Sequence, residues 1–468
     1  MRNRTNRQRR KFLQQLGVIG GGSTLLATQT KLQLIDSVLA ADYSRIQDHK
    51  SLVCIFLSGG NDAFNMFVPY QTTEYQHYRN IRQTLAIPRN QLLPVNGGID
   101  YAFHPSMGAA RNIYNQGHLA LISNVGTLYE PLTQQQYLAF KSGDKNIRVP
   151  PDLFSHSQQQ EIWQTNRSRE ATSIHPGWGG LIADLLDNAN SNPNIPPTIS
   201  LTSNNNLWQS GNRTQPFSVS SNGIKDFNYL TGALSSNRER SRTNSWNSIL
   251  QLNRNHVLEQ ESARSFRIAR RRITELQGVL LNAPQIQTQY PNRNDLAESL
   301  QMIARLISVR ETLGLKRQIF FVRHGSWDTH SNQISKHAAL LTTLNDALNA
   351  FYQTTLELGV SNTVTTFTAS EFGRTATSNG DGTDHGWGGH HLVMGGAVRG
   401  GSVHGILPDI TPESIDDASD AGRMIPTIAV DQYGATLAKW MGIADNDLSV
   451  IFPNLDRFST RDLGFMSL

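Results

Sequence analysis

Residues 370–391 bring together side chains of the kinds that bind divalent metal ions. These twenty-two residues contain three carboxylates, three histidines, one arginine and six glycines. Carboxylate oxygens and imidazole nitrogens are ligands for hard and borderline divalent cations, and glycines allow a backbone to close around an ion or an oxyanion. The β-branched run 363–368 comes directly before them, which predicts a strand that ends in a metal-binding loop.

Two other predicted strands also end in acidic or histidine-bearing loops. Asp62 follows the apolar run 51–57, and the pair Asp328 and His330 follows the run 318–323. Because the carboxyl ends of parallel strands meet at one edge of a sheet, we expect these loops to converge. The alternative for Asp62 is that it only caps a turn or the following helix.

Ionised groups that are held together need a cation to offset their repulsion. Two ions about 4 Å apart can hold both the attacking and the leaving oxygen of a displacement. The sequence therefore predicts one or two divalent ions, which are zinc, manganese, magnesium or calcium. The predicted ligands are Asp62, Asp328, His330, Glu371, Asp384 and His385.

Ser155 and Arg374 are the candidates for catalysis. Ser155 begins a predicted helix over 155–163. A helix amino terminus suits a capping serine, and it also favours a nucleophile that attacks an anion, so both roles stay open. Arg374 either stabilises extra negative charge during a reaction or is tied in a salt bridge.

The patterns along the rest of the chain predict an α/β fold with a mostly parallel sheet. Apolar or β-branched runs typical of buried strands occur at 51–57, 119–125, 197–201, 318–323, 363–368 and 391–394. Predicted helices alternate with them at 105–117, 181–186, 257–281, 295–313, 336–358 and 432–441. The segment 204–252 is rich in Asn, Ser, Arg and Thr, which predicts a surface-exposed insertion that serves as a lid or a small subdomain.

Composition narrows the class of partner. A hydrophobic content of 38% is too low for a multispan membrane protein. Residues 1–40 hold seven of the 42 Lys and Arg and one of the 37 acids, which leaves 35 bases and 36 acids in a nearly neutral remainder. This balance favours neither nucleic acid nor an anionic membrane as a partner. Cys54 is the single cysteine, so no intrachain disulfide can form, and we expect it to be core.

The amino terminus has the pattern of an export signal. Arg9, Arg10 and Lys11 precede Phe-Leu and a short, glycine-broken apolar segment. Paired arginines at this place are typical of a twin-arginine signal peptide over 1–40, which would engage the twin-arginine export machinery. We therefore predict a periplasmic or secreted protein without a stable membrane anchor, whose single mature domain spans 41–468. The alternative is a basic tail before an amphipathic helix.

Five motifs in order resemble those of an exported bacterial family called domain of unknown function 1501. They are Ser58-Gly59-Gly60-Asn61-Asp62, Ser155-His156, Gly325-Ser326-Trp327-Asp328-Thr329-His330, Ser370-Glu371-Phe372-Gly373-Arg374 and Thr383-Asp384-His385-Gly386-Trp387-Gly388. That family is regarded as a branch of the alkaline phosphatase and sulfatase superfamily. The resemblance implies a three-layer α/β sandwich with a metal site at the strand ends and a hydroxyl nucleophile at a helix start.

Carried over to this chain, the resemblance implies Ser155 as the nucleophile and Asp62 as the first carboxylate ligand. It makes Asp328 and His330 ligands of one ion, with Glu371 and His385 as the later ligands. Superfamily members have Asp-His where this chain has Glu371 and Phe372, so one histidine is missing. Either Asp384, His390 or His391 replaces it, or a single ion binds.

The sequence thus predicts a metal-dependent hydrolase of phosphate or sulfate esters that acts outside the cytoplasm. Its substrate would be a small-molecule or polymer ester. The alternative is an exported binding or assembly protein that keeps the fold, with or without one structural metal, and has no turnover.

Overall fold

The computed structural model describes residues 43–167, 175–202, 206–224, 237–252 and 255–468. The predicted signal peptide lies outside the described residues. Every element below belongs to residues 43–468, which form one compact unit.

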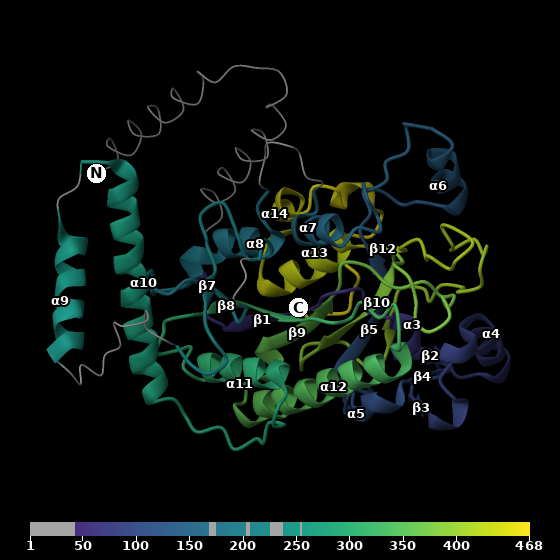
Figure 1. Cartoon of the computed structure of the whole chain (residues 1–468), viewed down its shortest axis with the longest axis horizontal. Coiled ribbons are helices and arrows are strands. Elements are labelled where there is room, and N and C mark those ends of the chain that lie inside the picture. Colours follow the sequence, from purple (N-terminus) through teal and green to yellow (C-terminus); the bar gives the residue numbers. More distant parts are fainter. Residues whose placement is uncertain (1–42, 168–174, 203–205, 225–236, 253–254) are drawn as a thin grey trace. The chain divides into compact units, whose positions relative to one another are not determined.

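A nine-stranded mixed sheet forms the centre of this unit (Figure 1). Its strand order is β11-β5-β10-β9-β1-β8-β6-β7, with β12 beside β5. The strands are β1 (Lys50–Leu57), β5 (Leu119–Gly126), β6 (Thr198–Ser200), β7 (Phe217–Ser218), β8 (Arg317–His324), β9 (Val364–Ala369), β10 (Gly389–Met394), β11 (Val403–His404) and β12 (Ile428–Ala429). All pairings are parallel except those of β10, which is antiparallel to both β5 and β9.

Helices cover both faces of the sheet (Figure 1). One layer holds α5 (Gly108–Asn115), α11 (Asp295–Ser308) and α12 (Gln333–Glu357), and the other holds α7 (His156–Thr165), α8 (Trp178–Leu186), α13 (Val430–Met441) and α14 (Asp445–Ile451). Successive side chains of a strand point to opposite faces. Accordingly Val53, Ile55 and Leu57 join the core beneath α11 and α12, whereas the ring of Phe56 packs edge-on against Trp163 of α7. The predicted three-layer α/β sandwich is confirmed.

Smaller elements surround this sandwich. A second, antiparallel sheet has the order β2-β4-β3. The remaining elements are β2 (Phe67–Pro69), β3 (Leu93–Pro94), β4 (Tyr101–Phe103), α3 (Ala63–Met66), α4 (Thr72–Arg82), α6 (Gln134–Lys141), α9 (Asn237–Gln251) and α10 (Val257–Leu281). None of the helices in the described part of the chain is long and apolar enough to cross a membrane.

The predicted elements agree closely with the structure where the apolar pattern is strong. The helix over 257–281 and all six predicted strands are present, and Cys54 is fully buried in β1 as expected. The helix expected over 295–313 ends earlier, at Ser308, and is followed by turns that lead to Gly314 with φ of +66°. A positive φ suits glycine, so Gly314 serves the turns after the helix and does not end the helix itself.

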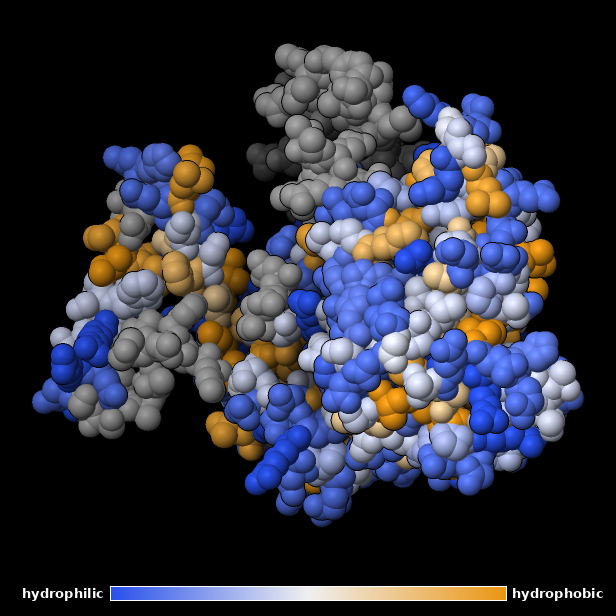
Figure 2. Space-filling view, turned by 45° about the vertical axis from the view of Figure 1, so that its right-hand side comes forward, coloured by the Kyte–Doolittle hydropathy of each residue, from blue (hydrophilic) through white to orange (hydrophobic). Residues whose placement is uncertain are grey.

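The segment 204–252 is not exposed throughout, contrary to the prediction. Trp208 is fully buried, and its ring lies 5.0 Å from that of Trp178 and 5.7 Å from that of Phe367. Amino-acid composition averaged over the segment conceals its buried residues, which also include Asn206, Gln209, Val219 and Leu250. Farther along, α9 pairs with α10 through the rings of Trp246 and Phe266, 5.5 Å apart. Exposed apolar side chains occur on this pair (Figure 2), among them those at 249, 257 and 258.

Asp431 generates a testable prediction about stability and pH. It is buried in the first turn of α13, where its Oδ1 accepts a hydrogen bond from the backbone N–H of Asn454 at 3.0 Å. Burial raises the pKa of Asp431 from 3.8 to about 7, although the hydrogen bonds from Asn454 oppose the shift. Between these two values the folded protein keeps a proton that the unfolded chain releases, so this residue's contribution to stability is lost as the pH rises.

Replacing Asp431 with Asn removes the titrating group and keeps an acceptor oxygen. We expect the free energy of unfolding of the variant, relative to the parent, to rise by up to about 4 kcal/mol between pH 4 and pH 7. Urea unfolding at several pH values measures this difference. A difference that stays constant with pH would contradict the assignment.

Candidate metal centre

The three strands at the middle of the sheet bring their carboxyl ends together. In β1, Leu57 is in register with His324 of β8, and Phe56 is in register with Ala369 of β9. The loops that follow therefore start at the same level. Gly59 permits their close approach, because its φ is +127° and a Cβ atom there would overlap the backbone nitrogen of Asp328.

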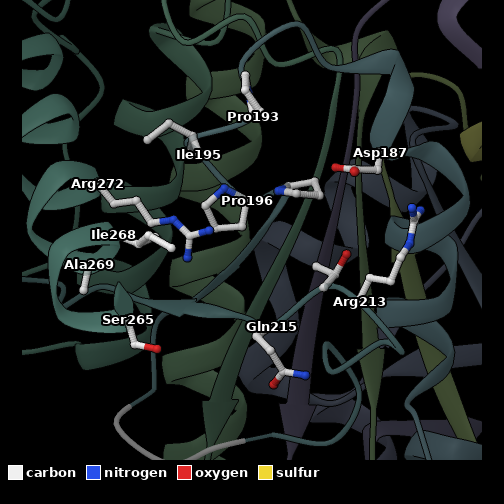
Figure 3. Close-up of a pocket in the computed structure, with 12 residues that line it drawn as sticks. Asp187, Pro193, Ile195, Pro196, Arg213, Gln215, Ser265, Ile268, Ala269 and Arg272 are labelled. Atoms are coloured by element: carbon white, nitrogen blue, oxygen red, sulfur yellow. The ribbon is translucent and has the colours of Figure 1, made fainter. Parts of the chain in front are cut away.

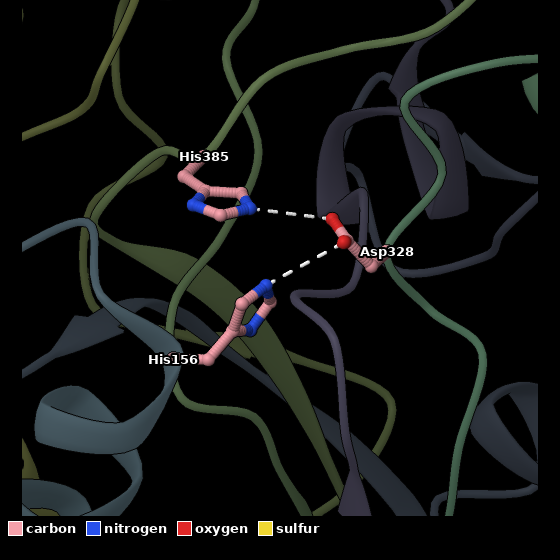
Figure 4. A group of neighbouring side chains, drawn as sticks. All are labelled: His156, Asp328 and His385. Carbon is pink, nitrogen blue, oxygen red and sulfur yellow. Dashed lines mark hydrogen bonds and ion pairs between the residues drawn. The ribbon is translucent and has the colours of Figure 1, made fainter.

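Three histidines direct their Nε2 atoms toward the carboxylate of Asp328. Figure 4 shows two of them, His156 and His385. The Nε2 atom of His330 lies 3.0 Å from Asp328 Oδ1, that of His385 lies 3.3 Å from the same oxygen, and that of His156 lies 3.5 Å from Oδ2. The Nε2 atoms of His330 and His385 are 3.1 Å apart. We call His156, Asp328, His330 and His385 the ligand group.

The opposite ring atom of each histidine faces an oxygen acceptor. Nδ1 lies 2.9 Å from Glu371 Oε1 in His156, 3.2 Å from Asp384 Oδ1 in His330, and 2.7 Å from the carbonyl oxygen of Phe154 in His385. An acceptor oxygen requires the proton on Nδ1, which leaves a lone pair on Nε2 of each neutral ring. Three such lone pairs then face one carboxylate. This is the arrangement by which histidines bind a metal ion while outer oxygens fix their tautomer.

The spacing of these atoms tests whether one ion fits. Ligands about 2.0–2.1 Å from a tetrahedral zinc lie about 3.3 Å from one another. Four of the six pairs within the ligand group have distances from 3.0 to 3.5 Å, two of them to Oδ1 of Asp328 and one to its Oδ2. The candidate ligand atoms of His156, Asp328 and His385 all lie within 4.8 Å of one another. These three residues thus fit a single divalent ion held by two nitrogens and a carboxylate, and His330, whose Nε2 lies 3.0 Å from Asp328 Oδ1, is the candidate for a further ligand.

The charge states of the group also suit a metal. Burial alone would raise the pKa of Asp328, but the hydrogen bond and charge of Arg374 outweigh it and lower that pKa. Burial lowers the pKa of His385, so this ring is neutral at pH 7. The hydrogen bond with Glu371 raises the pKa of His156, since the carboxylate favours the protonated ring. Metal binding would displace that proton.

Of the predicted ligands, Asp328, His330 and His385 come together, whereas two others lie behind them. Glu371 is fully buried and contacts His156, and it also accepts hydrogen bonds from the backbone N–H of Gly59 and from Gln160. Asp384 contacts Nδ1 of His330. The structure therefore places both carboxylates as partners of ligand histidines.

Asp62 has a different environment. Its Oδ2 atom accepts hydrogen bonds from the buried guanidinium of Arg82 and from the amide of Gln333. Its Oδ1 atom is buried and has no hydrogen-bond partner among the described residues. Both Arg82 and Gln333 bind this carboxylate, and Asp62 is not among the candidate ligands whose atoms lie within 4.8 Å of one another, so the structure favours a structural ion pair for Asp62.

Arg374 is tied in a salt bridge. It is fully buried, and its Nη1 atom lies 2.5 Å from Asp328 Oδ1. Its other N–H groups donate to the side chain and the carbonyl oxygen of Thr383. The guanidinium thus fixes Asp328 against the loop that carries His385, which is the second of the two roles that the sequence left open.

His156 is the ligand that the sequence analysis missed as an individual residue. It follows Ser155 at the first position of α7, and Gln160 lies one turn later on the same face, where its amide donates to Glu371 at 2.8 Å. The motif Ser155-His156 was the feature of the sequence that could have identified His156 as a ligand. His390 and His391 do not take the missing position, because both are buried in β10.

Phe372, which stands where a histidine was expected, lies against two histidines of the ligand group. Phe372 packs against His156 with ring centroids 4.9 Å apart and against His385 at 4.6 Å. The apolar ring of Phe372 thus packs against two imidazoles. His156, on α7, supplies the nitrogen that the expected histidine would have supplied.

Ser155 stands at the amino terminus of α7 without capping it. Its backbone occupies the N-cap position, yet its side chain makes no cap hydrogen bond, and its Oγ lies 3.3 Å from Ser157 Oγ. Arg423 contacts Phe154, the residue before Ser155. Its guanidinium stacks on the ring of Phe154 at 4.7 Å, and its Nε donates to the carbonyl oxygen of His385 at 3.0 Å.

A cavity of about 240 Å³ borders the site on the Gln160 side. Phe56 and Phe321 form apolar parts of its wall, and Gln160, Glu161 and Arg323 add polar groups. The Nη2 atom of Arg323 donates to Ser58 Oγ at 2.6 Å, and the same hydroxyl accepts from Gln160 at 3.3 Å. Hydrogen bonds therefore connect the cavity to Glu371 and through it to His156.

Metal analysis of variants provides the direct test of the ligand group. We expect the purified protein to hold about one equivalent of a divalent ion, and His156→Ala and His385→Ala to lose it. Glu371→Gln should lower the metal affinity about 10–100-fold, because it disturbs a partner of a ligand. Elemental mass spectrometry gives the content, and competition with a chelator gives the affinity.

The exposed histidine of α4 offers a matched control, since His77→Ala should retain the ion. Full metal content in both His156→Ala and His385→Ala would reject the ligand group. A protein that holds no metal after purification without chelators would reject it as well.

Solved structures that are similar to this chain at low identity include a sulfatase, a lipoteichoic acid synthase and an alkaline phosphatase. The chain is 10% identical to the PsFucS1 sulfatase from Pseudoalteromonas sp. (89% of this chain, 72% of that chain, TM-score 0.34). It is 8% identical to the lipoteichoic acid synthase LtaP from Listeria monocytogenes (93% and 81%, TM-score 0.34). It is 12% identical to wild-type alkaline phosphatase PafA (70% and 64%, TM-score 0.27).

The sequence comparisons give a narrower result. No curated protein matches the chain. One family model, described as a protein of unknown function (DUF1501), matches residues 49–431, which is most of the chain. The five motifs and the ligand group both lie within that range. The protein therefore belongs to the DUF1501 family, as the motifs predicted.

Proposed function

We propose that this protein is a metal-dependent hydrolase of phosphate or sulfate esters. One observation carries the proposal: three histidine Nε2 atoms face the carboxylate of Asp328 at the carboxyl edge of the sheet. Ser155, whose side chain does not cap its helix, is the neighbour of one of these histidines.

His156, Asp328, His330 and His385 would hold the ion. A divalent ion bound there lowers the pKa of a coordinated hydroxyl and offsets negative charge on an ester oxygen. The protein keeps the ligands in place through their outer contacts. Glu371 and Asp384 orient two of the histidines, and Arg374 fixes Asp328.

Ser155 supplies the nucleophile in this proposal. Its Oγ forms a bond to the phosphorus or sulfur atom, the ester bond to the alcohol breaks, and the departing alcohol takes up the serine proton. Water then attacks the seryl ester, releases phosphate or sulfate, and restores the serine hydroxyl. The amino terminus of α7 favours the anionic group that is being transferred.

Arg423 is better placed than Arg374 to bind that anion. Arg374 is fully buried and saturated by Asp328 and Thr383. Arg423 is half-buried, stands beside Phe154, the residue before Ser155, and uses its Nε for the carbonyl oxygen of His385. Its two terminal amino groups then remain for the ester oxygens. The cavity beside Gln160 would take part of the alcohol.

Exchange of two neighbouring serines tests the nucleophile. Ser155→Ala should lower turnover of any ester that the parent protein cleaves by at least about a thousandfold and leave the metal content unchanged. Ser157→Ala removes the hydroxyl 3.3 Å away and should keep most of the activity. An ester screen with the bound ion supplies the substrate for the assay.

Two outcomes separate the possibilities. Turnover that survives in Ser155→Ala would exclude the serine and leave metal-bound water as the nucleophile. Bound metal without turnover of any phosphate or sulfate ester would favour an exported binding or assembly protein.

Export by the twin-arginine pathway remains part of the proposal. It rests on Arg9 and Arg10 before a short apolar segment. We expect the exported protein to begin near Ala41, and Arg9→Lys with Arg10→Lys to stop its export. Amino-terminal sequencing of protein from outside the cytoplasm measures this, and a retained Met1 would contradict it.

A further inference from the structure

A second cavity, of about 390 Å³, lies between α10 and the segment 193–197 (Figure 3). None of its lining residues belongs to the ligand group or contacts it. Its size falls within the range of pockets that hold small organic ligands. The place of α10 beside this cavity is fixed, because Leu276 and Leu280 are part of the main core and Asn192 donates to Glu275 at 2.5 Å.

Arg272 lines this cavity as a cation without a counter-ion. It is half-buried, and its Nε donates to the carbonyl oxygen of Asn194 at 2.7 Å. No carboxylate of the described chain lies within ion-pair distance of it, and burial lowers its pKa below the usual value. The arginines at 82, 317 and 374, which are also buried, each contact an aspartate. Arg272 therefore differs from these arginines, and a bound anion would supply the counter-charge that it lacks.

The facing wall of the cavity carries a second arginine. Figure 3 shows Arg213 opposite Arg272, with the proline segment between them. The loop of Arg213 is rigid, because three backbone N–H groups over 212–214 donate to the buried carboxylate of Asp184. The Nη2 atom of Arg213 donates to the carbonyl oxygen of Asp184 at 2.5 Å. Its remaining N–H groups have no partner among the described residues.

Part of the wall is apolar, and Thr214, Gln215 and Ser265 add polar groups to it. The apolar part is formed by Pro193, Ile195, Pro196 and Pro197 from the body and by Ile268 and Ala269 from α10. The prolines fix the backbone φ of this wall. Asp187 on the side of Arg213 is the one acid of the lining and would repel a second negative charge there. The single anionic position is consequently at Arg272.

We propose that this cavity binds a small organic anion whose charged group pairs with Arg272 and whose apolar body lies on the proline segment and Ile268. The anion can be a carboxylate or a phosphate monoester, since a guanidinium accepts either. This site is independent of the proposed hydrolase reaction.

Four probes and a pair of neighbouring arginines test the proposal. Octanoate and hexyl phosphate carry both the anion and the apolar body, 1-octanol lacks the charge, and acetate lacks the body. Isothermal titration of the full protein should give at least tenfold tighter binding for one of the first two than for either of the others. Arg272→Gln should weaken that binding at least tenfold. Arg271→Gln changes the exposed neighbour on the same helix and should change it less than twofold.

A second variant guards against loss of folding. Ala269→Trp fills the cavity and keeps both arginines, and it should also abolish binding of the favoured probe, with melting temperatures reported for all variants. Equal binding of 1-octanol, absence of binding by both anionic probes, or unchanged affinity in Arg272→Gln would each overturn the proposal. Octanoate and hexyl phosphate binding with a tenfold difference would identify which anion the site prefers.

Discussion

Two imidazole lone pairs 3.1 Å apart, on Nε2 of His330 and His385, repel each other and the carboxylate of Asp328, even with Arg374 beside that carboxylate. The proton on each Nδ1 is held in place by an outer oxygen, so the rings cannot relieve the repulsion by changing tautomer. Either protons or a metal ion must enter. A proton on His156, whose pKa is raised by the hydrogen bond with Glu371, leaves the close nitrogens of His330 and His385 unchanged, and burial lowers the pKa of His385, which makes the metal ion the better solution at neutral pH. The loops at the carboxyl edge, the glycine at 59 and the buried arginine at 374 all serve to keep this arrangement in place.

The fold was largely predictable from the sequence because its central strands are continuous apolar runs. Strands such as β1 and β8 are buried on both faces, so their pattern has no competing explanation. The partners of β10 were not predictable. Its sequence reads as a strand, but only the three-dimensional path of the preceding loop makes it antiparallel to both neighbours.

The site was predictable in its loops and less so in its individual ligands. Asp328, His330 and His385 lie in motifs rich in metal-binding types, and they do come together. Glu371 and Asp384 could not be separated from ligands by type, since a carboxylate that orients a histidine has the same sequence signature as one that binds the ion. Asp62 depends on Arg82, which lies on a helix whose position relative to β1 no local pattern reveals. His156 was passed over because a lone histidine at a helix start is usually unremarkable.

The ligand group joins parts of the chain that are far apart, and this has a mechanical consequence. With one buried cysteine the protein has no disulfide with which to link distant segments. An ion shared by His156, Asp328 and His385 would close two long loops, as a covalent cross-link does, and would restrict the unfolded chain only after nearly the whole domain has been made. The ion would then bind only once folding of the domain is nearly complete. A pathway that exports folded proteins could carry such a cross-link across the membrane intact, whereas threading an unfolded chain would require it to be made anew on the other side.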